Sequence, residues 1–128
     1  MEKPLKILLV EDEVITAMVF INKLNRIGYS VVRHVTKGED AIISARQDHP
    51  DVIIMDIRLA GEMDGIDAAT AIKAETDIEV IFVTGYDDKD IRERAGKTKS
   101  RGYLTKPVDI IKIKSIFEDI ARERDVNP

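Results

Sequence analysis

Acidic residues follow a short apolar run near the N-terminus. The stretch LLVEDE, residues 8–13, places Glu11, Asp12 and Glu13 in succession. Burying a carboxylate costs on the order of several kcal/mol unless a cation or hydrogen-bond donors compensate it. We therefore expect a positive charge beside at least part of this acidic triplet.

Three later apolar runs also end in groups that can do chemistry. Asp56 follows one run, Thr84 follows the next, and the last leads into Lys106 and Pro107. Each has an ordinary explanation by itself, because acids cap helices, Asp forms turns, and Thr or Lys in a loop is usually solvated. Only their meeting at one place would indicate a site.

If these groups meet, their charges favour a divalent cation. Glu11, Asp12 and Asp56 would bring a charge of −3, which a divalent ion together with Lys106 balances. Oxygen ligands without cysteine or a nearby histidine favour Mg²⁺, with Mn²⁺ as a substitute. Open positions on the ion would admit a phosphoryl group, and Asp56 would be the nucleophile that accepts it.

The elements that must position these groups alternate along the chain. Short runs rich in Ile, Val and Leu predict five strands, at Leu5–Val10, Val31–Val35, Val52–Met55, Glu79–Val83 and Gly102–Leu104.

Segments of helical period lie between and after these runs. Thr36 and Glu39 have the spacing of a capping box at the start of the second helix. The fourth helix, about Asp87 to Thr98, has only Ile91 and Ala95 as clear apolar anchors, which predicts a weakly held element. Glu13 is expected to serve the start of the first helix rather than the metal.

Strand followed by helix, five times, with near-continuous apolar strands, predicts an α/β fold with a parallel sheet covered on both faces. Ligands bind such open sheets outside the carboxyl ends of the strands. Glu11, Asp12, Asp56, Thr84 and Lys106 all lie at those ends, so we expect them to share one crevice.

Composition narrows the class of protein. The chain has 128 residues, no cysteine and a net charge of −4, which suits one domain without disulfides or thiolate sites and argues against nucleic-acid binding by the whole surface. No apolar run is long enough to span a bilayer, so we expect a cytoplasmic protein. We predict a single domain over residues 1–122, followed by a tail or linker start at 123–128.

The motifs together resemble one family over Leu5 to Ala121, the receiver domains of two-component response regulators. They are LLVEDE, IIMDIRL with Asp56, VIFVTGY with Thr84, and GYLTKP with Tyr103 and Lys106. The resemblance implies a flavodoxin-like, doubly wound (βα)5 fold with strand order 2-1-3-4-5. It also implies a signalling phospho-acceptor that catalyses only its own phosphorylation and dephosphorylation.

The same resemblance implies roles for the metal ligands. Mg²⁺ would be held by Asp12, Asp56 and the backbone carbonyl of Arg58, while Glu11 would act through a bound water. Glu11 stands where the family usually has Asp. The segment AGEMDG, residues 60–65, appears one residue longer than usual, which predicts a more flexible loop.

The resemblance further implies a switch. Phosphorylation would draw Thr84 toward the phosphoryl group and let Tyr103 turn inward, and the Lys106–Pro107 bond would be cis. The donor would be a sensor histidine kinase or a histidine phosphotransfer protein. An effector or output domain would read the face formed by helix four, strand five and helix five, and a second copy of the chain would be a further partner after phosphorylation.

Other interpretations remain open for parts of the chain. One alternative is an aspartyl phosphohydrolase of the haloacid dehalogenase type, which requires a second Asp where this chain has Arg58. Another is a docking domain that is never phosphorylated, which would not need the full set of site residues. The basic segment 92–101 is expected to be a solvated helix face, with an acidic partner as the alternative. His34 and His49 lack metal-ligand spacing and are interpreted as structural or solvent-facing.

Overall fold

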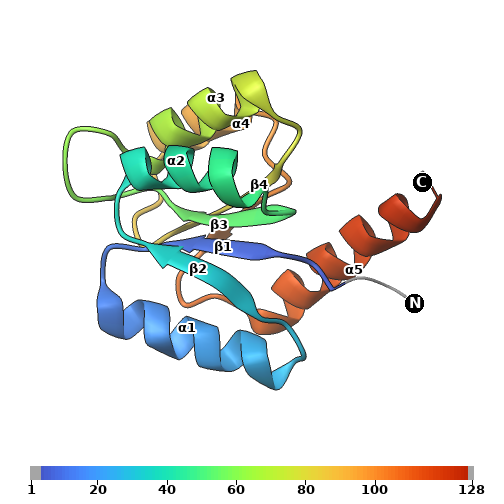
Figure 1. The fold of residues 1–128 in the computed structure, drawn as a ribbon. Coiled ribbons are helices and arrows are strands. Elements are labelled where there is room, and N and C mark those ends of the chain that lie inside the picture. Colours follow the sequence, from blue (N-terminus) through green and yellow to red (C-terminus); the bar gives the residue numbers. More distant parts are fainter. Residues whose placement is uncertain (1–3, 127–128) are drawn as a thin grey trace.

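The computed structural model describes residues 4–126, in which five strands and five helices alternate along the chain (Figure 1). The strands are β1 (Ile7–Val10), β2 (Val31–Val35), β3 (Val52–Asp56), β4 (Glu79–Thr84) and β5 (Gly102–Thr105). The helices are α1 (Val14–Arg26), α2 (Gly38–Asp48), α3 (Gly65–Glu75), α4 (Lys89–Gly96) and α5 (Ile110–Val126).

The strands form one parallel sheet in the order β2-β1-β3-β4-β5, which confirms the predicted fold class and strand order. Helices α2, α3 and α4 cover one face, and α1 and α5 cover the other (Figure 1). Alternate residues of β1 therefore enter different cores, with Leu8 on the first face and Leu9 on the second. Burial on both faces explains why the central strands are apolar throughout.

The register of β1 and β3 brings the acids together. Val10 lies beside Met55, so Glu11 and Asp56 continue two neighbouring strands at the same edge of the sheet. Asp56 is itself paired with Val83, one residue before Thr84. The carboxyl ends of three strands thus deliver the predicted groups to one edge.

Helix α2 begins differently from the prediction. Its N-cap is Lys37, which makes no side-chain capping bond, so the predicted capping box of Thr36 and Glu39 is wrong. The helix begins one residue later than that spacing requires, which places Glu39 in the second helical position rather than the third.

A capping box does form at the start of α3. Asp64 accepts a hydrogen bond of 2.8 Å from the amide of Asp67, and its own amide donates to the Asp67 carboxylate at 3.2 Å.

The loop after β3 returns closely to the end of that strand. The amide of Gly65 donates to the carbonyl of Ile57 at 2.7 Å. A Cβ at Gly65 would lie only 2.0 Å from the backbone oxygen of Asp56. A residue without a side chain is therefore required where α3 begins.

Helix α4 differs in length from its predicted bounds, and α5 bears on the predicted end of the domain. α4 is shorter than predicted, and within it only Ala95 is buried. α5 runs on to Val126, past residue 122, so the position of a domain boundary stays a prediction. Among residues 4–126, no helix has the length and apolar character needed to cross a membrane.

Candidate functional site

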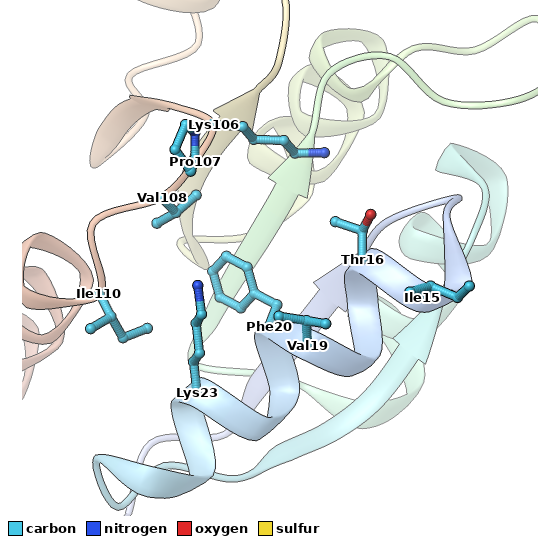
Figure 2. Close-up of a pocket in the computed structure, with 9 residues that line it drawn as sticks. All are labelled: Ile15, Thr16, Val19, Phe20, Lys23, Lys106, Pro107, Val108 and Ile110. Carbon is cyan, nitrogen blue, oxygen red and sulfur yellow. The ribbon is translucent and has the colours of Figure 1, made fainter.

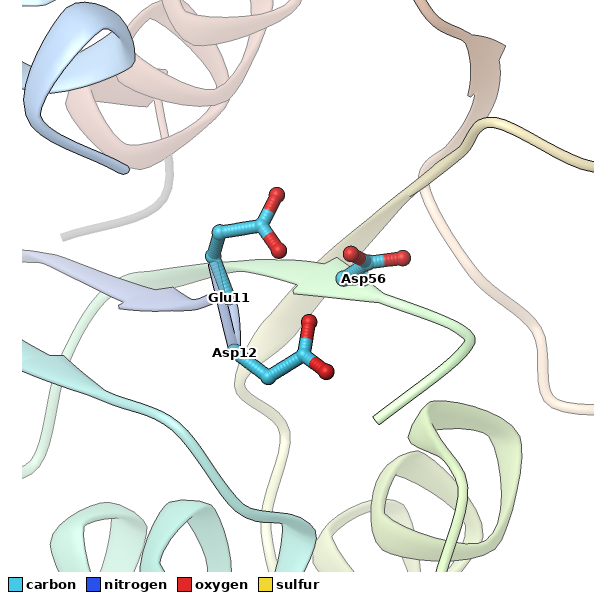
Figure 3. A group of neighbouring side chains, drawn as sticks. All are labelled: Glu11, Asp12 and Asp56. Atoms are coloured by element: carbon cyan, nitrogen blue, oxygen red, sulfur yellow. The ribbon is translucent and has the colours of Figure 1, made fainter. Parts of the chain in front are cut away.

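Three carboxylates converge at the edge of the sheet, as predicted. Glu11, Asp12 and Asp56 each offer an oxygen atom, and these oxygens lie within 4.8 Å of one another (Figure 3). Glu11 and Asp56 are only 3% and 4% exposed, whereas Asp12 is half-buried. Three carboxylates so close together form an all-oxygen donor set of the kind that hard divalent cations prefer.

Lys106 provides the positive charge at this cluster. Its Nζ lies 2.6 Å from Oε1 of Glu11 and 2.9 Å from Oδ2 of Asp56, so one ammonium group pairs with both buried acids. The backbone of Lys106 is tied to β4, because its amide donates to the carbonyl of Thr84 at 2.8 Å. The Lys106–Pro107 peptide bond is cis, which confirms that expectation.

One cation does not fully balance the acids. Burial, and then the neighbouring Glu11 carboxylate, raise the pKa of Asp56 to about 7, although Lys106 opposes this. Burial alone would raise the pKa of Glu11, but hydrogen bonds to Asp56 and Lys106 hold it below its usual value. Without a metal ion, Asp56 therefore holds its proton up to a pH of about 7, whereas Glu11 is already ionised at lower pH.

Asp12 is the outermost acid of the cluster. Burial and the adjacent Glu11 charge raise the pKa of Asp12 above its usual value. A divalent cation would relieve this repulsion, so the donor set and its charge fit Mg²⁺ or Mn²⁺. Glu13 lies at the N-cap of α1 but makes no side-chain capping bond; its amide instead donates to Oε2 of Glu11 at 3.2 Å.

Thr84 lies at the end of β4 with its hydroxyl fully buried. Oγ1 donates to the carbonyl of Tyr86 at 2.9 Å and accepts from the Tyr86 amide at 3.1 Å. The ring of Tyr86 in turn stacks under the guanidinium of Arg58, at 3.9 Å from the ring centroid. The predicted role of the Arg58 carbonyl as a metal ligand stays a prediction.

Tyr103 belongs to a polar cluster that sequence reasoning did not find. Its hydroxyl donates to Asp87 at 3.1 Å, and Arg92 forms two bonds of 2.7 Å to the same carboxylate. The Arg92 guanidinium also lies 5.2 Å from the centre of the Tyr103 ring. These three residues, the Asp87–Arg92–Tyr103 cluster, tie the β4–α4 loop to β5 and hold the Tyr103 hydroxyl.

His34 of β2 also reaches the site, a contact that sequence reasoning missed. Its Nε2 lies 2.8 Å from the backbone carbonyl of Glu11. The only signal in the sequence was the position of His34 near the carboxyl end of a strand. It is half-buried at the same edge of the sheet as the acids.

A groove opens beside the cluster, between α1 and the segment that joins β5 to α5 (Figure 2). It encloses about 260 Å³ and is mainly apolar, and we call it the α1–α5 groove. On α1 the apolar surface continues through Ile15 and Met18, which are 78% and 59% exposed. The lining residues are Ile15, Thr16, Val19, Phe20, Lys23, Lys106, Pro107, Val108 and Ile110.

Comparison with known sequences places this site in a family. The sequence profile of the "Response regulator receiver domain" matches residues 7–118. The "Transcriptional regulatory protein PdtaR" of Mycobacterium tuberculosis is 33% identical over 84% of this chain, and the chain spans about half of that relative, 52% of its length. The "Polar-differentiation response regulator DivK" of Brucella ovis is 31% identical over 81% of this chain and 85% of its own length.

Solved structures that superpose on this chain belong to the same kind of domain as the relatives found by sequence. A signal receiver domain of a modulated diguanylate cyclase from Desulfovibrio desulfuricans superposes with a TM-score of 0.88 at 28% identity, covering 98% of this chain and 100% of that one. The N-terminal domain of a response regulator/sensory box/GGDEF protein from Carboxydothermus hydrogenoformans gives a TM-score of 0.82 at 32% identity, over 95% and 98% of the two chains. This chain therefore belongs to the response regulator receiver domain family.

Proposed function

We propose that this chain accepts a phosphoryl group on Asp56 from a phosphohistidine, in a reaction that depends on Mg²⁺, and so acts in a phosphorelay. One observation carries the proposal: Asp56 shares a cluster of oxygens within 4.8 Å with Glu11 and Asp12 and lies 2.9 Å from the Lys106 ammonium. Asp12 and Asp56, with the Arg58 carbonyl, would hold the ion, and Glu11 would act through a water. When bound, Mg²⁺ supplies positive charge for the phosphoryl oxygens.

The chemical step needs little from the protein beyond position and charge. An ionised Asp56 oxygen attacks phosphorus and forms a P–O bond, while the P–N bond to the donor imidazole breaks and its nitrogen keeps the electron pair. With a pKa of about 7, Asp56 is only partly ionised near neutral pH, so added positive charge also raises the fraction able to attack. Lys106 then donates to a phosphoryl oxygen. Catalysis would be limited to this phosphorylation and to hydrolysis of the aspartyl phosphate, in which water takes the phosphoryl group and Asp56 is released.

The signal would leave the site through Thr84 and Tyr103. A phosphoryl oxygen competes for the Thr84 hydroxyl, which is otherwise held by Tyr86. Release of that contact moves the β4–α4 loop, and Tyr103 leaves the Asp87–Arg92–Tyr103 cluster and turns inward. This local charge event biases a loop with two arrangements.

Partners would meet two different faces. The donor, a sensor histidine kinase or a histidine phosphotransfer protein, would approach over the α1–α5 groove, because Lys106 lies in both that groove and the acid cluster. An effector or output domain, or a second copy of the chain, would bind the face of α4, β5 and α5. We place the domain in the cytoplasm and assign it no direct nucleic-acid binding.

Incubation with Mg²⁺ and acetyl phosphate should add one phosphoryl group, measured by intact mass. Asp56→Asn should abolish the addition because the nucleophile is lost, and Asp12→Ala should abolish it because a metal ligand is lost. Glu13→Ala, which removes an acid from the same triplet but outside the ligand set, should label almost as well as the unaltered chain. Undiminished labelling of Asp56→Asn would overturn the proposal.

A further inference from the structure

We infer that His34 is a positioning residue that fixes the metal-binding acids through the backbone of Glu11; this inference rests on the proposed function. His34 lies on β2, the strand that pairs with β1, whose end leads into Glu11 and Asp12. Its Nε2 is 2.8 Å from the Glu11 carbonyl. Because a carbonyl oxygen can only accept, Nε2 carries a proton and donates it.

The backbone explains why this carbonyl needs a side-chain donor. In a strand, the amide and carbonyl of one residue point toward the same neighbour. The Glu11 amide donates to the Val35 carbonyl of β2 at 3.0 Å, so the Glu11 carbonyl also faces β2. β2 ends at Val35, and Lys37 is already at the N-cap position of α2, so the backbone ladder between β1 and β2 ends there. His34 supplies the donor for the Glu11 carbonyl.

An irregularity in the sheet places His34 where it can do this. The pairing of β1 with β2 shifts by one residue between Ile7 and Leu8, so that Leu9 lies beside His34 and Val10 beside Val35. Without the shift, the same count along β2 would place Arg33 beside Leu9. The shift therefore places His34, rather than Arg33, on the face of the sheet that Leu9 shares, two residues before Glu11.

The bonded carbonyl belongs to the peptide group that joins Glu11 to Asp12. Orienting that group sets the direction in which Asp12 leaves the sheet, and with it the distance of its carboxylate from Asp56. Positioning of this kind lowers the cost of assembling three repelling carboxylates around a cation. Loss of the His34 bond should therefore weaken metal binding more than it weakens the fold.

Isothermal titration calorimetry of the purified chain with Mg²⁺ alone tests the inference. His34→Ala should weaken Mg²⁺ binding roughly three- to tenfold, as expected for one lost hydrogen bond, with one ion still bound per chain. His34→Gln, whose amide nitrogen can reach the same carbonyl, should stay within about twofold of the unaltered chain. Circular dichroism of each variant confirms that it is folded.

His49→Asn is the matched control. His49 is the C-cap of α2, away from the carboxyl ends of the strands, and its φ of 49° is a conformation that Asn tolerates. The Mg²⁺ affinity of His49→Asn should therefore equal that of the unaltered chain.

Unchanged Mg²⁺ affinity of His34→Ala, or a loss in His34→Gln as large as in His34→Ala, would overturn the inference. Acetyl phosphate labelling of the unaltered chain tests the proposed function separately. An unaltered chain that binds no Mg²⁺ would overturn both.

Discussion

At the scale of single residues, ionisation of Asp56 is unfavourable in the folded protein, and a bound cation would make it more favourable. Its carboxyl is buried beside Glu11, and its pKa is raised to about 7. In the unfolded chain the same group ionises near its ordinary pKa of about 3.9. Between these values the folded state binds a proton that the unfolded state has lost, so metal-free stability falls as the pH rises toward and through 7.

Replacing Asp56 with Asn should remove this loss of stability. In the presence of a chelator, the free energy of unfolding of the unaltered chain should fall, relative to Asp56→Asn, by on the order of 2–4 kcal/mol between pH 5 and 8. Urea unfolding followed by circular dichroism at several pH values measures the difference, and the contributions of groups distant from Asp56 cancel between the two proteins. Parallel pH curves for the two proteins would contradict the assignment of the raised pKa to Asp56.

At the scale of elements, the β4–α4 loop is held by contacts that the proposed inward turn of Tyr103 would have to break. α4 buries only Ala95 of its own residues, so apolar packing holds it weakly. The Asp87–Arg92–Tyr103 cluster adds polar contacts near its N-terminus, and Asp88 caps the helix by accepting from the Ile91 amide at 2.8 Å. These contacts favour the arrangement in which Tyr103 is held by Asp87.

Weakening the cluster should favour the phosphorylated arrangement. Asp87→Asn removes the ion pair with Arg92, and an exposed pair of this type contributes only weakly. Because phosphorylation and the loop arrangement are linked, the initial rate of labelling by acetyl phosphate should rise by about 1.5- to 5-fold. Asp90→Asn, an exposed acid in the first turn of α4 outside the cluster, is the control. A slower or unchanged rate in Asp87→Asn would count against this role of the cluster.

At the scale of the whole molecule, metal binding at the three acids would be coupled to folding. The three acids come from two strands, with Glu11 and Asp12 after β1 and Asp56 at the end of β3, so only the folded chain presents them together. Mg²⁺ at about 100 times its dissociation constant should therefore stabilise the protein by about 2.7 kcal/mol and raise Tm by roughly 5–10 °C. Thermal unfolding with and without Mg²⁺ measures this. Asp12→Ala should lose the increase and Glu13→Ala should keep it; an equal increase in both variants would point to binding elsewhere.

The sequence predicts the elements better than their side-chain partners. Near-continuous apolar runs predict the strands, and the rule for parallel sheets predicts that Glu11, Asp56 and Lys106 meet. The contact of His34 depends on a one-residue shift in pairing, which no local pattern indicates. The start of α2 at Gly38 likewise depends on where β2 ends rather than on the spacing of Thr36 and Glu39.

The close approach of Gly65 to Asp56 bears on how this chain tolerates insertions. The Gly65 amide is hydrogen-bonded to the Ile57 carbonyl, so both ends of the loop at residues 58–64 are anchored beside Asp56. Residues added between those anchors lengthen only the outer part of the loop, at a small entropic cost. A change of length in the AGEMDG segment can thus leave Asp56 where it is. A foreign peptide or reporter inserted at Gly61 should be accepted on the same grounds, whereas any side chain at Gly65 would collide with the backbone of Asp56.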